Sequence, residues 1–498
     1  MPAFSLVDEP WLPCLTKDGR PTDVSLRDAI LNSHDLRELF DPSPLVTVAL
    51  HRLLLALVRR IYGLHSDGDW LSVWSGGRFD PGPANRYFAE HAGDFDLFHA
   101  TRPFMQVPPA RDVKSHPVSW LMHEASSGNN PTLFDHSVDA APRALTPAQT
   151  ARYLLALHAA ALGGGVSEPF NFCDAPLARD CAALVYGETL FSTLLLNSPP
   201  LPPAAAGEPV WEWDRVPAPE RGGTPVSGEL ALLTWPARRI SLMRDPLSGL
   251  VAACQIRQGL VAPADCVDPH KAYRPDQHGS LTPLRLALQR AVWRDVPVWL
   301  GAPSGTHPPR ALRWLTSGSA LDLAGGAIES PLRLVVFGLV TAPGRASIYL
   351  WRQDRCPLPL SCLRDSETVH EFAAAVARAE ACGSALTAAL SFLNRLLGVP
   401  AEAASSTVND CLLTYWSELD SAASRLLLLG IPPRGDWNAR LAGAARRAYD
   451  MALERVGRTA GRARLVAAAR RFFEQRLATA SAVPPDMVRA EGVNAHVG

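Results

Sequence analysis

The run SETVHEFAAAVARAEACGSALTAALSFLNRLLGVP at residues 366–400 is the strongest structural signal in this sequence. Alanine and leucine recur in it at 3.6-residue spacing, and a glycine and a proline close the run at 398–400. This pattern predicts a long helix that ends at that break. The same character continues toward the end of the chain, with further breaks at 430–436 and 457–461. Three breaks separate four helices, so we predict a four-helix bundle over residues 365–498.

The residues before this run have a mixed character. Residues 45–62 carry apolar side chains on most of a helical circumference, which predicts a buried helix. The stretch LRLVVFGLVTAPGRASIYLWRQD at 332–354 predicts two strands joined by a Pro343-Gly344 turn. We therefore predict an α+β protein with a large mixed α/β domain at 1–364 followed by the helical bundle.

Composition bounds the class of protein. A chain of 498 residues with 47% hydrophobic and 19% charged residues has enough apolar sequence for two or three packed domains. The formal net charge of −1 gives no global polyanion-binding signature. Any nucleic-acid surface must therefore be local.

One local basic region lies near the carboxy terminus. Residues 434–476 contain eleven arginines against Asp436, Asp450, Glu454 and Glu474, a surplus of seven positive charges. This surplus fits a helix face that follows phosphates. A solvated helix face or a contact with an acidic neighbouring protein is an equally weighted alternative.

Cysteine spacing and the amino terminus bear on metals and location. The nine cysteines include no CxxC pair, so we predict no zinc site, no cofactor and reduced thiols. Asp8, Glu9 and Pro10 interrupt the place where a secretion signal needs an apolar core. His51 and Arg52 break the longest apolar run. These features predict a cytoplasmic protein without a membrane partner.

Three consecutive glycines, Gly163, Gly164 and Gly165, stand in the stretch ALGGGVSEPFNF at 161–172. No Gly-Lys-Ser/Thr follows them, and the dinucleotide fingerprint and a GxSxG elbow are both missing. A backbone surface that offers N–H donors to a phosphate or a base edge remains possible. A tight loop whose glycines only let two elements pack is weighted equally.

Catalytic signals are sparse. His34 and Asp35 form an isolated pair, and no further ligands or nucleophile stand at a useful spacing, so we predict that the chain is not an enzyme. The segment TAPGRAS at 341–347 places Arg345 beside a proline-glycine turn. A protruding hairpin tip of this kind is one way to wedge into a DNA groove, although an ordinary surface turn is favoured on the residues alone.

Several stretches, taken together and in order, resemble the CasA family, the large subunit of the type I-E CRISPR Cascade surveillance complex. They are FSLVDEPWLP, SPLVTVALHRLLLALVRRIYG, GRFD with FDLFH and RPFMQ, SGNNPTLFDH, ALGGGVSEPFNF, DPHKAYR and IYLWRQDRCPLP. They cover most of the first 360 residues, and the helical tail matches in position.

The resemblance implies a non-catalytic subunit with an α/β domain and a four-helix bundle. Its implied role is to recognise the protospacer-adjacent motif (PAM) in double-stranded target DNA and to promote duplex opening, so that crRNA pairing forms an R-loop. The implied partners are the target DNA, the crRNA-containing Cascade subunits (backbone, small and 5′-handle-binding subunits) and a helicase-nuclease effector.

The resemblance also implies site residues. A glycine loop that meets the PAM from the minor groove falls on Gly163 and Gly164, with Gly165 beside them. A basic minor-groove reader falls on Arg257. A hairpin wedge falls on Gly344 and Arg345, with Arg345 closest to the position where the family often carries glutamine. The family's mobile loop falls on the residues Asn129, Asn130, Leu133, Phe134 and Asp135.

Two alternatives stay open. In the first, the chain is a mainly structural subunit of a divergent RNA-guided complex in which other residues read the PAM. Arg345, at the position where the family often carries glutamine, favours this alternative. A stand-alone hydrolase that uses the glycine loop is disfavoured, because the nucleophile and the base are both missing.

Overall fold

The structure is a computed structural model, in which the chain forms two compact units. It describes residues 4–125, 143–302, 304–318, 321–322, 328, 331–341, 348–429, 434–456 and 460–482. The first unit comprises residues up to 272, 283–288 and 309–355, and the second comprises 273–282, 289–308 and 356 onward.

The first unit contains the three-stranded sheets of the described residues. Their strand orders are β2-β1-β3, β11-β10-β5 and β4-β7-β6. The strand pairs β1–β2, β1–β3, β10–β5, β4–β7 and β6–β7 are antiparallel. The strands are β1 (Leu12–Thr16), β2 (Pro21–Val24), β3 (Leu36–Leu39), β4 (His116–Pro117), β5 (Ala182–Tyr186), β6 (Arg238–Arg244), β7 (Val251–Gln258), β10 (Leu332–Thr341) and β11 (Ile348–Leu358). The predicted pair of strands around residues 342–347 is confirmed, since β10 and β11 are hydrogen-bonded neighbours.

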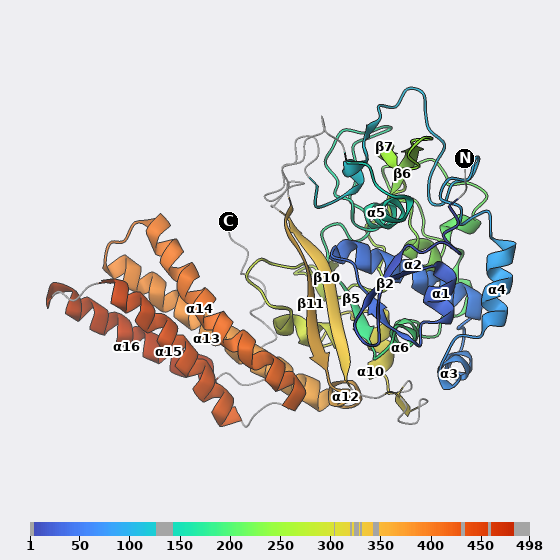
Figure 1. The fold of residues 1–498 in the computed structure, drawn as a ribbon. Helices are drawn as coiled ribbons and strands as arrows, with labels where there is room; N and C mark the ends of the chain where they lie inside the picture. Colours follow the sequence, from blue (N-terminus) through green and yellow to red (C-terminus); the bar gives the residue numbers. More distant parts are fainter. Residues whose placement is uncertain are drawn as a thin grey trace. The chain divides into compact units, whose positions relative to one another are not determined.

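Helices surround these sheets (Figure 1). They are α1 (Leu26–Leu31), α2 (Pro44–Tyr62), α3 (Asp67–Ser75), α4 (Pro81–Glu90), η1 (Val118–Leu121), α5 (Pro147–Ala160), α6 (Leu190–Leu196), α7 (Pro203–Ala206), η2 (Val210–Glu212), α8 (Glu229–Leu233) and α10 (Arg310–Thr316).

Helix α2 is the centre of this unit. Its residues from Pro44 to Arg59 are buried, which confirms the buried helix predicted over 45–62. It packs against α5, α8 and β10. Its two buried arginines have carboxylate partners, because Arg52 binds Asp268 and Arg59 binds Glu229. Both buried charges of this helix therefore have counterions, as burial of charge requires.

The same core holds buried histidines. Burial lowers the pKa of His51, His123 and His158 to about 4 and that of His270 to about 3. The unfolded chain titrates these groups near 6.5, so it binds more protons than the folded chain between about pH 6.5 and 4. Stability therefore falls as the pH falls through this window.

We expect the free energy of unfolding to drop by up to about 2 kcal/mol per buried histidine between pH 6.5 and about pH 5. Urea denaturation at a series of pH values measures this drop. A His278→Gln variant, which replaces an exposed histidine, should show the same drop as the parent chain. A stability that stays flat over this range would contradict the neutral, buried state of the four histidines.

The second unit contains the long carboxy-terminal helices. Its elements are β8 (Tyr273–Pro275), β9 (Leu281–Pro283), η3 (Val292–Asp295), α9 (Val296–Trp299), α12 (Leu360–Arg364), α13 (Ser366–Leu396), α14 (Ala401–Leu429), α15 (Arg434–Val456) and α16 (Ala460–Ala482). The predicted breaks separate the last four of these helices. The mixed fold with a helical carboxy-terminal region is thereby confirmed.

Helices α13 to α16 pack together in a bundle. Helix α13 contacts each of the other three, and α15 contacts both α14 and α16. Buried side chains join them: Tyr415 Oη donates to the Ala379 carbonyl at 2.8 Å, and the Tyr449 and Phe473 rings stack with centroids 4.4 Å apart. Gly383 on α13 leaves room for the Tyr415 ring, since a Cβ there would lie 3.4 Å from Tyr415 Cε1.

A segment far from the bundle in sequence belongs to the same unit. Within residues 289–308, Arg290 and Arg294 both donate to Glu380 on α13, and the Arg294 guanidinium lies 3.5 Å from the centre of the Trp416 ring. Trp293 Nε1 donates to Asp420 on α14 at 2.6 Å. Long-range pairs of this kind have no local sequence signal.

The domain boundary at 364/365 stays a prediction about where a separately folding domain begins.

The arginine-rich helices carry internal ion pairs. Arg446 binds Glu474, Arg470 binds Asp450 and Glu474, and two others reach α14, where Arg447 binds Glu418 and Arg455 binds Asp410. Counting charges over residues 434–476 alone missed the acidic residues of α14. The surplus of positive charge at this surface is smaller than the sequence indicated.

Candidate nucleic-acid interface

The three glycines begin a closed loop directly after α5. Helix α5 starts with a capping box, in which Thr146 and Gln149 satisfy each other's backbone N–H groups, and it ends at Ala160. After the glycines the chain folds back on itself, because Gly164 N donates to the Phe172 carbonyl and Phe172 N donates to the Gly165 carbonyl, at 2.8 and 2.9 Å. Residues 163–174 therefore form an ordered loop rather than a slack tether.

A different structural feature accounts for each of the three glycines. A Cβ on Gly163 would lie 2.8 Å from the Phe172 carbonyl oxygen and 2.9 Å from the backbone of Cys173 and Asp174, so close packing requires glycine there. Gly164 has φ +106°, which side chains rarely adopt, and faces open space. Gly165 is exposed, has no positive φ, and its Cβ would meet only the Phe172 ring, at 3.2 Å. The packing interpretation thus holds for Gly163, while Gly164 and Gly165 present bare backbone to the outside.

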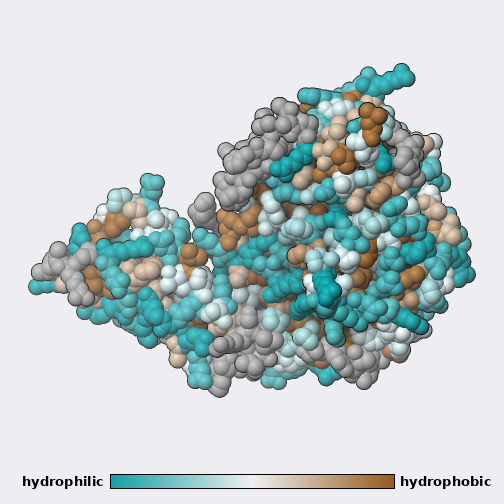
Figure 2. Space-filling model, viewed as in Figure 1, coloured by the Kyte–Doolittle hydropathy of each residue, from teal (hydrophilic) through white to brown (hydrophobic). Residues whose placement is uncertain are grey.

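The loop tip continues with an exposed hydrophobic residue. Val166 is 91% exposed, whereas the face of the molecule in Figure 2 is mainly hydrophilic, with hydrophobic residues scattered over it. The Arg221 guanidinium lies over the Phe170 ring of the same loop, 5.5 Å from its centre. The tip is therefore a small apolar and backbone surface with a cation beside it.

A buried arginine holds the base of the loop. Arg238, the first residue of β6, donates to the carbonyls of Ala161 and Leu162 at 3.3 and 3.0 Å. Its guanidinium also lies 4.9 Å from the centre of the Phe172 ring. Burial lowers the pKa of Arg238, and nearby Asp174 partly offsets this effect, so that the pKa is about 10. The residue stays cationic at neutral pH and fixes both arms of the loop.

An acidic residue links the loop to β10. Asp174 accepts from Gly163 N at 2.6 Å and from Arg179 Nε at 2.6 Å. Arg179 in turn donates to the Thr341 hydroxyl at 3.1 Å. Thr341 is the last residue of β10, so the glycine loop is tied to the point where the predicted wedge segment begins.

A second link joins the loop to β7. Gln258 accepts from Cys173 N through Oε1 at 2.7 Å, and its backbone N–H donates to the Ser167 hydroxyl at 2.8 Å. Gln258 directly follows Arg257 in β7. The structure therefore places the loop that contains Gly163, Gly164 and Gly165 against Gln258, the residue that follows Arg257.

Other predicted site residues fall outside the described residues. Gly344 and Arg345 lie in the segment 342–347, and the mobile-loop residues lie in 126–142. Of the hairpin, the structure describes the two strands up to Thr341 and from Ile348.

Sequence reasoning missed the residues that hold the loop. Asp174 lies two residues beyond the glycine-rich stretch at 161–172, and Gln258 follows Arg257, but no local pattern marks either as a partner of the loop. The consecutive Arg238 and Arg239 in a strand were a usable signal, since alternate side chains of a strand point to opposite faces. Which partner each one meets depends on strand register and was not predictable.

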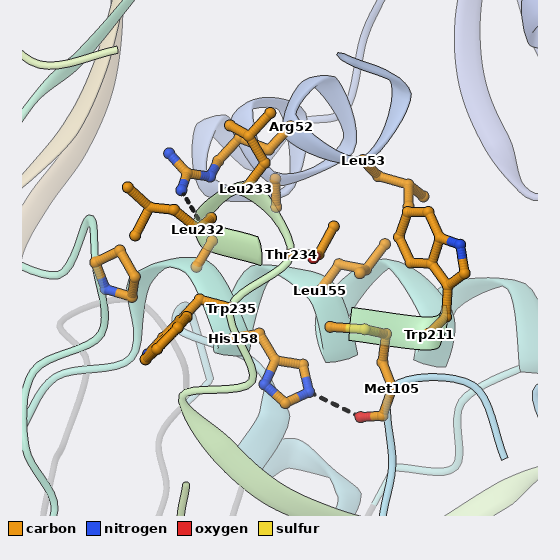
Figure 3. A pocket seen from close by; sticks show the side chains of 13 residues that line it. Arg52, Leu53, Met105, Leu155, His158, Trp211, Leu232, Leu233, Thr234 and Trp235 are labelled. Atoms are coloured by element: carbon orange, nitrogen blue, oxygen red, sulfur yellow. Dashed lines mark hydrogen bonds between the residues drawn. The ribbon is translucent and has the colours of Figure 1, made fainter. Parts of the chain in front are cut away.

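One cavity in the apolar interior is too small for a substrate. That cavity has a volume of about 20 Å³ and lies between α2, α5 and the 232–235 segment (Figure 3). Arg52 donates to the Leu232 carbonyl at its wall, and His158 hydrogen-bonds the Met105 carbonyl. This volume corresponds to about one water molecule. The cavity is a packing defect rather than a catalytic pocket.

In the part of the chain that the structure describes, no group of three or more His, Cys, Asp or Glu residues is arranged to hold a metal ion. No helix of that part is long and apolar enough to cross a bilayer.

Comparisons with known proteins identify the family. The family described as CRISPR-associated protein Cse1 matches residues 5–460. A curated CasA/Cse1 protein of Thermus thermophilus is 35% identical over 372 residues, which is 72% of each chain. The chain belongs to the Cse1 (CasA) family.

Solved structures agree with this assignment. The structure of Thermus thermophilus CasA (Cse1) has a TM-score of 0.82 and 30% identity, and the match covers 96% of this Cse1-family chain and 100% of that one. A chain in a structure described as a CRISPR RNA-guided surveillance complex has the same fold, with a TM-score of 0.78 and 24% identity over 96% and 100% of the two chains.

Proposed function

We propose that this Cse1-family chain is the non-catalytic large subunit of an RNA-guided type I-E Cascade complex and that it recognises the PAM in double-stranded target DNA. It then promotes opening of the duplex for crRNA pairing and helps to recruit the helicase-nuclease. Family membership supports the assignment, and the related fold in an RNA-guided surveillance complex supports the proposed crRNA-containing partners.

The observation that carries the proposal is the bare backbone of Gly164 and Gly165 at the tip of an anchored loop. The minor groove of B-DNA is about 6 Å wide, so a side chain at the point of contact would collide with its walls. Backbone N–H and carbonyl groups are small enough to reach the base edges there. Gly163 serves this surface indirectly, because it allows the loop to close tightly.

Arg257 supplies the positive charge of this interface. Its Nε is shielded from solvent and has no hydrogen-bond partner among the described residues. Gln258, its neighbour, is bonded to the glycine loop, so the loop and Arg257 reach the DNA as one unit. Loop, arginine and wedge segment then meet the same few base pairs, with the protein reading the motif and the guide reading the rest.

Direct binding measurements test this function. The guide-loaded complex should bind matched duplex DNA more tightly with this chain than without it, and the gain should shrink as salt is added. If the chain adds no affinity for duplex DNA at low salt, a DNA-recognition role is excluded.

Arg345 is proposed as the wedge residue, which yields a kinetic prediction. Arg345→Ala should slow duplex opening about tenfold or more while the initial affinity for duplex DNA changes much less, because the wedge acts after binding. Stopped-flow fluorescence of a base analogue beside the PAM measures opening. Ser347→Ala, in the same segment, is the control. Equal opening rates in all three proteins would mean that the segment does not act as a wedge.

A further inference from the structure

Two arginines face each other across neighbouring strands next to the glycine loop. Arg239 in β6 and Arg257 in β7 are direct partners in the antiparallel register. Directly opposite side chains lie on the same face of a sheet, with Cβ atoms about 4.5–5.5 Å apart. Like charges in this position repel each other, so the pair destabilises the free protein.

No carboxylate relieves this repulsion in the described part of the chain. Arg239 donates to the Pro217 carbonyl at 3.0 Å, and neither arginine forms an ion pair with a described residue. The Nε atoms of both are shielded from solvent and lack an acceptor. Burial and the charge of Arg257 together lower the pKa of Arg239. Both residues are half-buried, and an anion that arrives from outside would offset the repulsion between their charges.

The pair adjoins the glycine loop through two connections. Gln258, next to Arg257, binds Ser167 and Cys173 of the loop. On the other strand, Arg239 holds Pro217, in the segment whose Arg221 covers the Phe170 ring at the loop tip. The two arginines therefore each stand one position along the strand from a residue that holds the loop, Arg239 beside Arg238 and Arg257 beside Gln258.

We propose that Arg239 and Arg257 together bind one phosphate group of the DNA backbone beside the glycine loop. This inference rests on the proposed function and adds Arg239 to the interface. Planar guanidinium groups match phosphate oxygens through paired hydrogen bonds, and two of them neutralise one phosphate while their own repulsion is relieved. A phosphate contact sets where the duplex lies but carries no sequence information. Arg239 thus fixes the register in which the glycines meet the base pairs.

Salt titration of DNA binding tests this site. In the guide-loaded complex, Arg239→Gln should lower the affinity and reduce the slope of log affinity against log salt concentration by up to about 0.9, the value for one whole phosphate contact, since Arg257 still faces that phosphate. The loss of affinity should be similar for all flanking sequences. Arg86→Gln, which removes an exposed arginine on α4, should leave the slope unchanged.

A thermal measurement on the free chain separates binding from folding. Arg239→Gln removes the cross-strand repulsion, so its melting temperature without added anion should equal or exceed that of the parent chain. Inorganic sulfate, used as the probe, should raise the melting temperature of the parent chain more than that of the variant.

Three results would overturn the phosphate site. The first is an Arg239→Gln variant with unchanged salt slope and unchanged affinity. The second is a variant whose only change is a lower melting temperature. The third is a variant that loses flank selectivity at constant slope, which would make Arg239 a base reader. If the parent complex shows no flank preference at all, the proposed PAM role fails, while the slope change still decides the phosphate site.

Discussion

Replacing Gly165 by aspartate is expected to weaken binding of the guide-loaded complex to PAM-bearing duplex DNA on the order of 100-fold, equivalent to about 2–3 kcal/mol. Gly165 is exposed, and its backbone conformation is open to other residues. A carboxylate there adds bulk in a narrow groove and a negative charge beside phosphates. Equilibrium binding of the complex to labelled duplex DNA measures the loss, and thermal melting of the free chain checks the fold.

Gly68→Asp is the matched control for this change. Gly68 is an exposed glycine in the first turn of α3, where an acidic residue is well tolerated. It adds the same charge to the same unit away from the loop, so DNA binding should stay at the parent level. Parent-level affinity in a folded Gly165→Asp variant would remove the loop tip from the interface.

Gly163 and Gly164 are less suitable positions for this test. A side chain at Gly163 collides with backbone, and a side chain at Gly164 is strained by a φ of +106°. Loss of binding in either variant would mix a folding defect with a binding defect. At Gly165, of the three positions, a loss of DNA binding can be measured without a folding defect.

The second large effect concerns stability. Asp268→Asn is expected to lower the free energy of unfolding by about 3–5 kcal/mol, because it leaves the charge of Arg52 buried without a counterion. Arg52 Nη1 lies 3.0 and 2.8 Å from the two carboxylate oxygens, and both side chains are almost fully buried. Burial alone raises the pKa of Asp268, but Arg52, His270 and Lys271 lower it below its ordinary value. The carboxylate is therefore charged at neutral pH.

An exposed ion pair provides the comparison. Asp8→Asn removes the partner of Arg27 at the surface, where such pairs contribute less than about 1 kcal/mol. Urea denaturation of both variants at neutral pH gives the two values. A loss below about 1 kcal/mol for Asp268→Asn would mean that water or another acceptor reaches Arg52, and that Asp268 is not needed to neutralise its charge.

The helical parts of the fold were predictable because their signals are local. The buried helix over 45–62 and the breaks between α13, α14, α15 and α16 follow from periodicity, glycine and proline within a few turns of the chain. The cap at Ser25, which accepts from Asp28 N, is a signal of the same local kind.

Contacts between distant segments were not predictable in this way. The association of Arg290 and Arg294 with Glu380 joins residues about ninety positions apart, and Arg239 meets Arg257 only because of strand register. The glycine run stood out in the sequence, but its division into Gly163 for packing and Gly165 for exposure depends on the path of residues 172–174. A sequence pattern identifies residues of unusual chemistry, whereas the backbone path decides what each of them faces.

The most direct test is binding of the guide-loaded complex, with and without this chain, to duplex targets whose flanking trinucleotide is randomised. Sequencing of bound and unbound DNA gives the preference for each flank. We predict that the chain produces flank-selective binding and that Gly165→Asp removes the selectivity. Binding that is uniform across flanks, or identical without the chain, would contradict PAM recognition and leave the chain a structural subunit.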